Sequence, residues 1–176
     1  VTHVTIPAGQ EITSDRAPLS VHAQADIVVS VYLAGEISRW VYGVTKSASA
    51  STYCTDREGG NRAAETSGDA FVNPMQPIGW LSAVDVYSTM TTGSVVVIGD
   101  SIADGVGSTI DGYDRWTDML VTRMSRAATS KPLANVAIPG GTCVNANGWG
   151  PTVLDRLDRD VFSQSDVSHV ILEIGT

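Results

Sequence analysis

A serine in the middle of the chain follows a strongly apolar run and is flanked by small polar residues. Gly99, Asp100 and Ser101 come directly after four β-branched residues, and Asp104 and Gly105 follow within one helical turn. Residues of this kind build tight turns and cap helices. Ser101 is therefore expected at a strand-to-helix turn, where its hydroxyl can act as a nucleophile and its backbone N–H can bind a carbonyl oxygen.

A glycine later in the chain offers matching chemistry. Gly140 ends a second apolar run, and its bare backbone can bring another N–H to the same place, because the carboxyl ends of parallel strands meet at one edge of a sheet. On spacing alone, however, Asp100 and Ser101 also suit a simple helix cap without any chemistry. Both interpretations stay open at this point.

The elements that must position these groups follow from the apolar pattern. Val95–Ile98 has no polar alternation, which is typical of a strand buried on both faces of a parallel sheet. Further elements are expected as a helix over Tyr113–Ala127, a strand over Leu133–Ile138, a helix opening at Pro151 and a strand over Val170–Ile174. This βαβαβ order predicts half of a three-layer, flavodoxin-like α/β fold with right-handed crossovers. The charged residues between Asp155 and Asp160 are expected to form a solvated helix face.

The first half of the chain has a different pattern, rich in β-branched and aromatic residues. The expected strands are Ile27–Leu33, Trp40–Thr45, Ser51–Thr55 and Gly79–Tyr87. Turn residues separate these runs, and no helical period appears before residue 90. The sequence therefore predicts a β-sandwich-like all-β domain over residues 1–90, followed by an α/β domain over residues 91–176.

Composition excludes several function classes. The net charge of -8 argues against a nucleic-acid partner or an anionic membrane surface, and no apolar run is long enough to span a membrane. Gly105–Ile110 matches only part of a dinucleotide-binding fingerprint, so no cofactor is expected, and the two cysteines are not spaced as a metal site. The acidic balance, few lysines and abundant serine and threonine suggest a secreted protein. Cys54 and Cys143 are either two thiols or one long-range disulfide.

Three blocks of the second half together carry a family resemblance. They are Gly99–Ile102 with Asp104–Gly105 and Arg115–Trp116, then Asn135–Gly140, and then Ile171–Gly175. These blocks resemble the GDSL, or SGNH, hydrolases, which are esterases and lipases. The first half, with Val4–Gly9, is similar to the amino-terminal β-domain of a secreted subgroup of these enzymes.

The resemblance implies ester hydrolysis through a covalent acyl-enzyme. Ser101 would be the nucleophile, and the N–H groups of Ser101 and Gly140 would form the oxyanion hole. Gly99, Asp100 and Asp104 would support the turn. The implied substrate is a small acyl ester or an acylated carbohydrate.

The chain departs from the family pattern at the catalytic base, which the family takes from a D-x-x-H block near its carboxyl terminus. This chain contains only His3, His22 and His169. Asp166–His169 reads as D-x-x-H, but it lies at the start of the third expected strand, a strand length away from Ser101. The family's third-block Asn is also absent. We therefore expect a chain truncated at both ends, which needs its missing carboxyl-terminal segment and is nearly inactive alone.

An alternative from another class is a carbohydrate-binding or interaction module that retains a degenerate hydrolase half. The aromatic residues Trp40, Tyr42, Tyr53 and Trp80 would stack against sugars if they were exposed. Aromatic residues in strands more often belong to the core. The two functions differ in whether Ser101 is needed.

Overall fold

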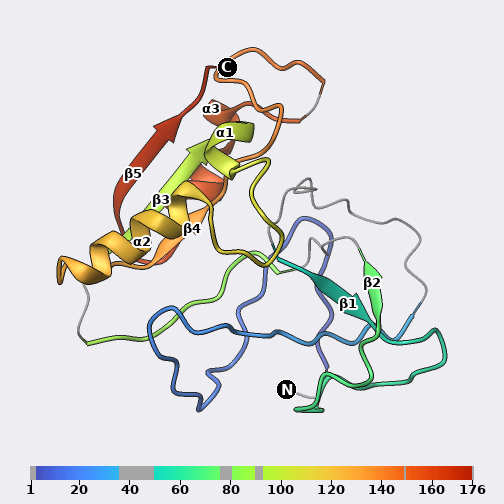
Figure 1. The fold of residues 1–176 in the computed structure, drawn as a ribbon. Coiled ribbons are helices and arrows are strands. Elements are labelled where there is room, and N and C mark those ends of the chain that lie inside the picture. Colours follow the sequence, from blue (N-terminus) through green and yellow to red (C-terminus); the bar gives the residue numbers. More distant parts are fainter. Residues whose placement is uncertain (1–2, 36–49, 76–80, 90–92, 149, 176) are drawn as a thin grey trace.

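The second half of the chain contains a three-stranded parallel sheet. The computed structural model describes residues 3–35, 50–75, 81–89, 93–148 and 150–175. The central strand is β3 (Ser94–Gly99), and it pairs with β4 (Leu133–Asn135) on one side and β5 (Val167–Glu173) on the other. Both pairings are parallel (Figure 1), as expected for strands joined by helical crossovers.

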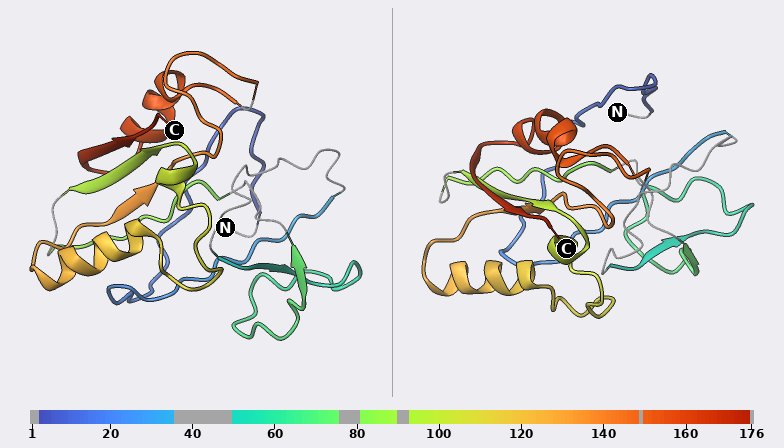
Figure 2. Two further views of the ribbon diagram at one scale, coloured as in Figure 1. Left: turned by 45° about the horizontal axis from the view of Figure 1, so that its top comes forward. Right: turned by 90° about the horizontal axis from the view of Figure 1, so that it is seen from above.

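Helices cover both faces of this sheet. α1 (Ser101–Asp104) follows β3 directly, α2 (Trp116–Arg126) leads to β4, and α3 (Val153–Arg156) continues into the π-helical segment η1 (Leu157–Phe162) before β5. The right-hand view of Figure 2 shows α2 on one side of the sheet and α3 with η1 on the other. The predicted three-layer βαβαβ half is therefore confirmed. None of the helices in the described ranges is long and apolar enough to cross a membrane.

The core is built around β3, whose side chains alternate between the two faces. Val96 and Ile98 pack with Val153 and Val161 under α3 and η1. On the opposite face, Val97 packs with small residues of α1 and of the segment after β4. Fully burying one such aliphatic side chain contributes about 1.5–3 kcal/mol. The unbroken apolar run therefore stabilises β3 through contacts on both faces of the sheet.

Two strand boundaries differ from the sequence prediction. β5 begins at Val167 rather than Val170, because its ladder with β3 extends back to a pairing of Ser94 with Val167. β4 ends at Asn135 rather than Ile138. The chain nevertheless stays beside β3 as far as Ile138, whose N–H donates to the Gly99 carbonyl at 3.1 Å.

The prediction of a solvated charged face over residues 155–160 is wrong for Arg156. Its side chain is almost completely buried, and its Nη1 donates to the Val136 carbonyl at 2.9 Å and to Asp160 at 2.8 Å. Asp155, Asp158 and Arg159 are exposed, as expected. The guanidinium thus ties the helical layer to the segment that follows β4.

The structure does not confirm the all-β domain of the first half. Its described part contains one antiparallel pair, β1 (Thr52–Cys54) with β2 (Asn73–Met75), drawn away from the parallel sheet in Figure 1. β1 confirms the expected strand at Ser51–Thr55. Ile27–Leu33 and residues 81–87 form no strand, so those predictions are wrong. Trp40–Thr45 and residues 79–80 lie outside the described residues, and the domain division at residue 90 stays a prediction.

The structure describes one of the four aromatic residues that the sugar-binding alternative requires. Tyr53 lies on β1 and is 51% exposed. Trp40, Tyr42 and Trp80 lie outside the described residues. A sugar-stacking surface therefore stays a prediction.

The two cysteines are free thiols in this structure. Cys54 is half-buried on β1, whereas Cys143 is exposed in the loop before α3. The structure therefore supports the interpretation as two thiols over that of a long-range disulfide.

Candidate active site

Asp100 organises the turn that carries Ser101. It is 3% exposed and caps α1, with its Oδ1 accepting from the Ile102 N–H at 2.9 Å. Its Oδ2 accepts from the Gly175 N–H at 3.1 Å, and its own N–H donates to the Glu173 carbonyl at 3.3 Å. One buried carboxylate thus joins the ends of β3 and β5 to the start of α1, where Ser101 is the first helical residue.

Gly99 is required by close packing at the end of β3. A Cβ added at this position would lie 1.7 Å from the Glu173 carbonyl oxygen and 2.7 Å from the Ala103 Cβ. Because the first of these atoms belongs to the backbone of the neighbouring strand, no side chain fits without moving that strand. The missing side chain lets α1 fold back against the sheet edge and hold Ser101 there.

Gly140 lies in the turn that follows β4, beside the Ser101 turn. Its φ of +77° is a conformation that favours glycine. A Cβ on the next residue, Gly141, would lie 3.2 Å from the Gly99 carbonyl oxygen and 3.8 Å from the Asp100 Cα. Among the described residues, no acceptor binds the backbone N–H of Ser101 or of Gly140. Both N–H groups are thus without a protein acceptor in this part of the chain.

Asp104 is a buried acid at the carboxyl end of α1. It is 4% exposed, and burial raises its pKa to about 6, although the nearby Arg115 guanidinium acts in the opposite direction. Arg115 also forms an ion pair with Asp118, with 3.0 Å between Nε and Oδ2. The structure thus places Gly99, Asp100 and Asp104 around the Ser101 turn.

His169 lies far from Ser101 along the sheet. It pairs with Val95 near the start of β5, whereas Glu173 at the other end pairs with Gly99. Four residues of strand separate the two positions, or about 13 Å at about 3.3 Å per residue. The His169 Nδ1 instead lies 2.8 Å from the Ser168 Oγ.

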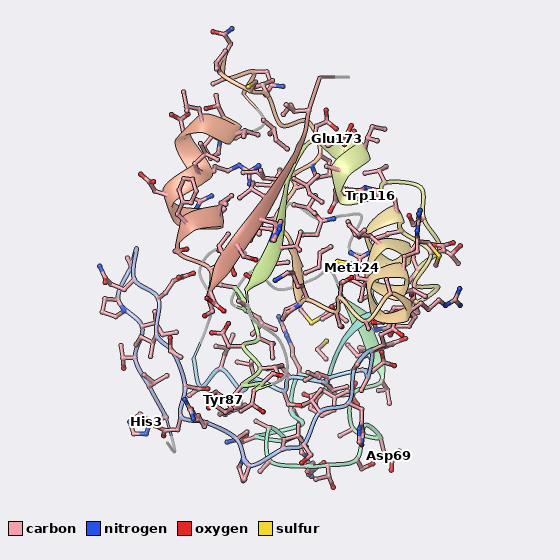
Figure 3. All side chains as sticks on the ribbon, turned by 90° about the vertical axis from the view of Figure 1, so that its left-hand side faces the viewer. His3, Asp69, Tyr87, Trp116, Met124 and Glu173 are labelled. Carbon is pink, nitrogen blue, oxygen red and sulfur yellow. The ribbon has the colours of Figure 1, made fainter. Side chains whose placement is uncertain are left out.

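The other two histidines are exposed in the first half of the chain. In Figure 3, His3 lies at the opposite end of the molecule from Glu173, which closes β5. Within the described ranges, no hydrogen bond joins Ser101 to any histidine, and no group of three or more His, Cys, Asp and Glu side chains is placed to hold a metal ion. Among the described residues, Ser101 therefore has no histidine as a hydrogen-bond partner.

The sequence blocks contain two further residues with roles that the sequence prediction missed. The Asn135 Nδ2 donates to the Ala103 carbonyl at 2.8 Å, and the Trp116 Nε1 donates to the carbonyls of Ala103 and Ile102, each at 3.2 Å. The available signal was an amide inside a buried strand and an indole N–H, since both need a partner when they leave water. The sequence did not indicate that α1 would supply the acceptors.

The parallel sheet and the position of Ser101 define a class of protein. It is an α/β protein of the doubly wound type with a serine at the carboxyl edge of its central strand, the edge at which such sheets bind ligands. Residues 95–176 match the model of the GDSL-like lipase/acylhydrolase family. This match confirms the resemblance found in the three blocks and supports a hydrolase that acts on esters. A comparison with curated proteins found no match.

Proposed function

We propose that this chain carries the nucleophile and part of the oxyanion hole of a serine esterase that hydrolyses short acyl esters, including acylated carbohydrates. The observation that carries the proposal is the contact between the turn after β3 and the turn after β4, where a Cβ on Gly141 would lie 3.8 Å from the Asp100 Cα. Two turns from neighbouring strands meet there, and each has a backbone N–H without a protein acceptor among the described residues. Donors held in place in this way stabilise charge that develops on a carbonyl oxygen.

The reaction would proceed through an acyl-enzyme. The Ser101 Oγ attacks the ester carbonyl carbon and loses its proton to a general base, while the carbonyl oxygen becomes an oxyanion between the N–H groups of Ser101 and Gly140. The alcohol leaves with a proton returned by the base. Water then attacks the acyl group, and the carboxylic acid leaves as Ser101 regains its proton.

We propose that the general base comes from outside residues 1–176. His169 lies near the start of β5, at the opposite end of the strand from Ser101, and its Nδ1 lies 2.8 Å from the Ser168 Oγ. A base must come within about 3 Å of the proton it removes, directly or through one water, so a strand length is too far. The Asn that completes the oxyanion hole in this family is proposed to come from outside the chain as well.

Hydrolysis of p-nitrophenyl acetate by the natural full-length protein tests this function. Ser101→Ala is expected to lower kcat by about 1,000-fold or more, because the covalent step is lost. Ser94→Ala is the matched control, since Ser94 lies at the opposite end of β3 and its hydroxyl bonds to the Ser165 carbonyl. Equal turnover by Ser101→Ala and the unsubstituted protein would contradict the proposal.

The same assay tests the origin of the base. Residues 1–176 alone are expected to show almost no Ser101-dependent turnover, and His169→Gln in the full-length protein is expected to leave kcat unchanged. Ser101-dependent turnover by the 176-residue polypeptide that disappears in His169→Gln would show that His169 is the base after all.

We also propose that the protein is secreted, which rests on its acidic composition and net charge of -8. Immunodetection of the natural protein in culture medium and in washed cells tests this. Protein confined to the cells would contradict it.

A further inference from the structure

The one-turn helix α1 depends on side chains from other elements. A single helical turn is not stable by itself, because nucleation fixes several residues for one hydrogen bond and leaves the terminal carbonyls without helical partners. Asp100 caps its amino end. At its carboxyl end, the Ala103 carbonyl accepts from both Asn135 and Trp116. The orientation of Ser101 is therefore set from both ends of this turn.

Asn135 is itself fixed on both sides of its amide. Its Nδ2 donates to the Ala103 carbonyl at 2.8 Å, and its Oδ1 accepts from the Ala137 N–H at 3.1 Å. Ala137 lies between β4 and the Gly140 turn and is 2% exposed. One side chain thus joins the helix that begins with Ser101 to the segment that leads into Gly140.

We propose that Asn135 is a positioning residue that sets the spacing between the two oxyanion-hole N–H groups, and that Trp116 assists it by holding the same carbonyl. This inference rests on the proposed function, because it assigns Ser101 and Gly140 to the oxyanion hole. It adds a role for Asn135 and Trp116, which contact carbonyls of α1 and are not themselves part of the oxyanion hole. Asn135 acts on both donor segments, whereas Trp116 acts on α1 alone.

Trp116 is placed to act without being part of the buried core. Its ring is 36% exposed at the start of α2, while its Nε1 reaches two carbonyls of α1. Figure 3 shows Trp116 and Glu173 at the same end of the molecule, beside α1. Replacing Trp116 by Phe keeps a six-membered aromatic ring and removes the N–H donor together with the five-membered ring, so both hydrogen bonds to α1 are lost while part of the ring packing is kept.

The test uses Asn135→Asp and Trp116→Phe in the natural full-length protein. Asn135→Asp is nearly isosteric, keeps the acceptor for Ala137 and replaces the donor to Ala103 by an oxygen. We expect kcat for p-nitrophenyl acetate to fall about 10- to 100-fold with KM within about threefold, since removing a whole oxyanion donor costs about 100- to 1,000-fold. Trp116→Phe is expected to lower kcat about 3- to 10-fold.

A second readout separates positioning from a general loss of folded protein. A boronic acid adds to the serine oxygen and places an oxygen in the oxyanion hole, so its inhibition constant is expected to rise by about the same factor as kcat falls. A smaller folded fraction would lower kcat and leave this constant unchanged. Asn73→Asp is the matched control, because it breaks an exposed asparagine hydrogen bond to Asp56 in the first half.

Hydrogen exchange locates the effect. In Asn135→Asp, the amides of Asp104, Gly105 and Val106, which donate to carbonyls of α1 or its cap, are expected to exchange at least about tenfold faster, while those of α2 keep their rates. Unchanged kcat and boronate inhibition in both variants would overturn the positioning role and leave the esterase proposal intact. Absence of Ser101-dependent turnover in the unsubstituted protein would overturn the esterase proposal, and the positioning role with it.

Discussion

Gly99→Ala is expected to lower the free energy of unfolding of the α/β half by about 3 kcal/mol or more. The new Cβ would lie 1.7 Å from the Glu173 carbonyl oxygen, which belongs to the backbone of β5. Overpacking a core by one methyl usually costs about 1–3 kcal/mol, when flexible side chains give way. Here the obstacle is the backbone of β5, which is hydrogen-bonded to β3, and Ala103 closes the other side at 2.7 Å. The cost is therefore expected at or above the upper end of that range.

Urea unfolding followed by circular dichroism measures this change, with Gly68→Ala as the matched control. Gly68 has nothing within 4 Å of an added Cβ and has an ordinary backbone conformation. The control is expected to be as stable as the parent or slightly more stable. Equal midpoints for Gly99→Ala and Gly68→Ala would show that β3 and β5 separate at little cost.

The parts of the fold that the sequence predicted are those in which burial alone determines the element. Val95–Ile98 consists of four β-branched residues without a polar one, which favours a strand covered on both faces, and it forms part of β3. The turn at Asp100 and Ser101 was predictable because small polar residues have few roles at the end of such a strand. In both places, local chemistry and the tertiary environment favour the same structure.

The parts that failed depend on partners that a local pattern does not specify. Ile27–Leu33 has the composition of a strand, but strand propensity yields a ladder only where another strand supplies hydrogen bonds. Arg156 was expected in water because it stands among charged residues, yet the helical phase turns it towards the Val136 carbonyl. The acceptors of Asn135 and Trp116 lie on a helix of one turn, which no periodicity predicts.

Protonation of Asp104 is expected to make the protein more stable in mild acid than its composition alone would suggest. Burial raises the pKa of this carboxyl from 3.8 to about 6 in the folded state. The folded protein therefore binds the proton more tightly than the unfolded chain between these two values. The associated stability is fully present below about pH 4 and is lost as the pH rises through 6. At about 1.4 kcal/mol per pKa unit, the total is about 3 kcal/mol.

Asp104→Asn isolates this contribution, because asparagine has nearly the same shape and carries no charge at any pH. Its free energy of unfolding relative to the parent is expected to rise by about 3 kcal/mol between pH 3.5 and pH 7.5. Taking the difference between the two proteins at each pH removes the groups that titrate in both. Asp158→Asn, an exposed position on η1, controls for the loss of one negative charge. A difference for Asp104→Asn that stays constant across this range would mean that the buried carboxyl holds its charge, with Arg115 outweighing its burial.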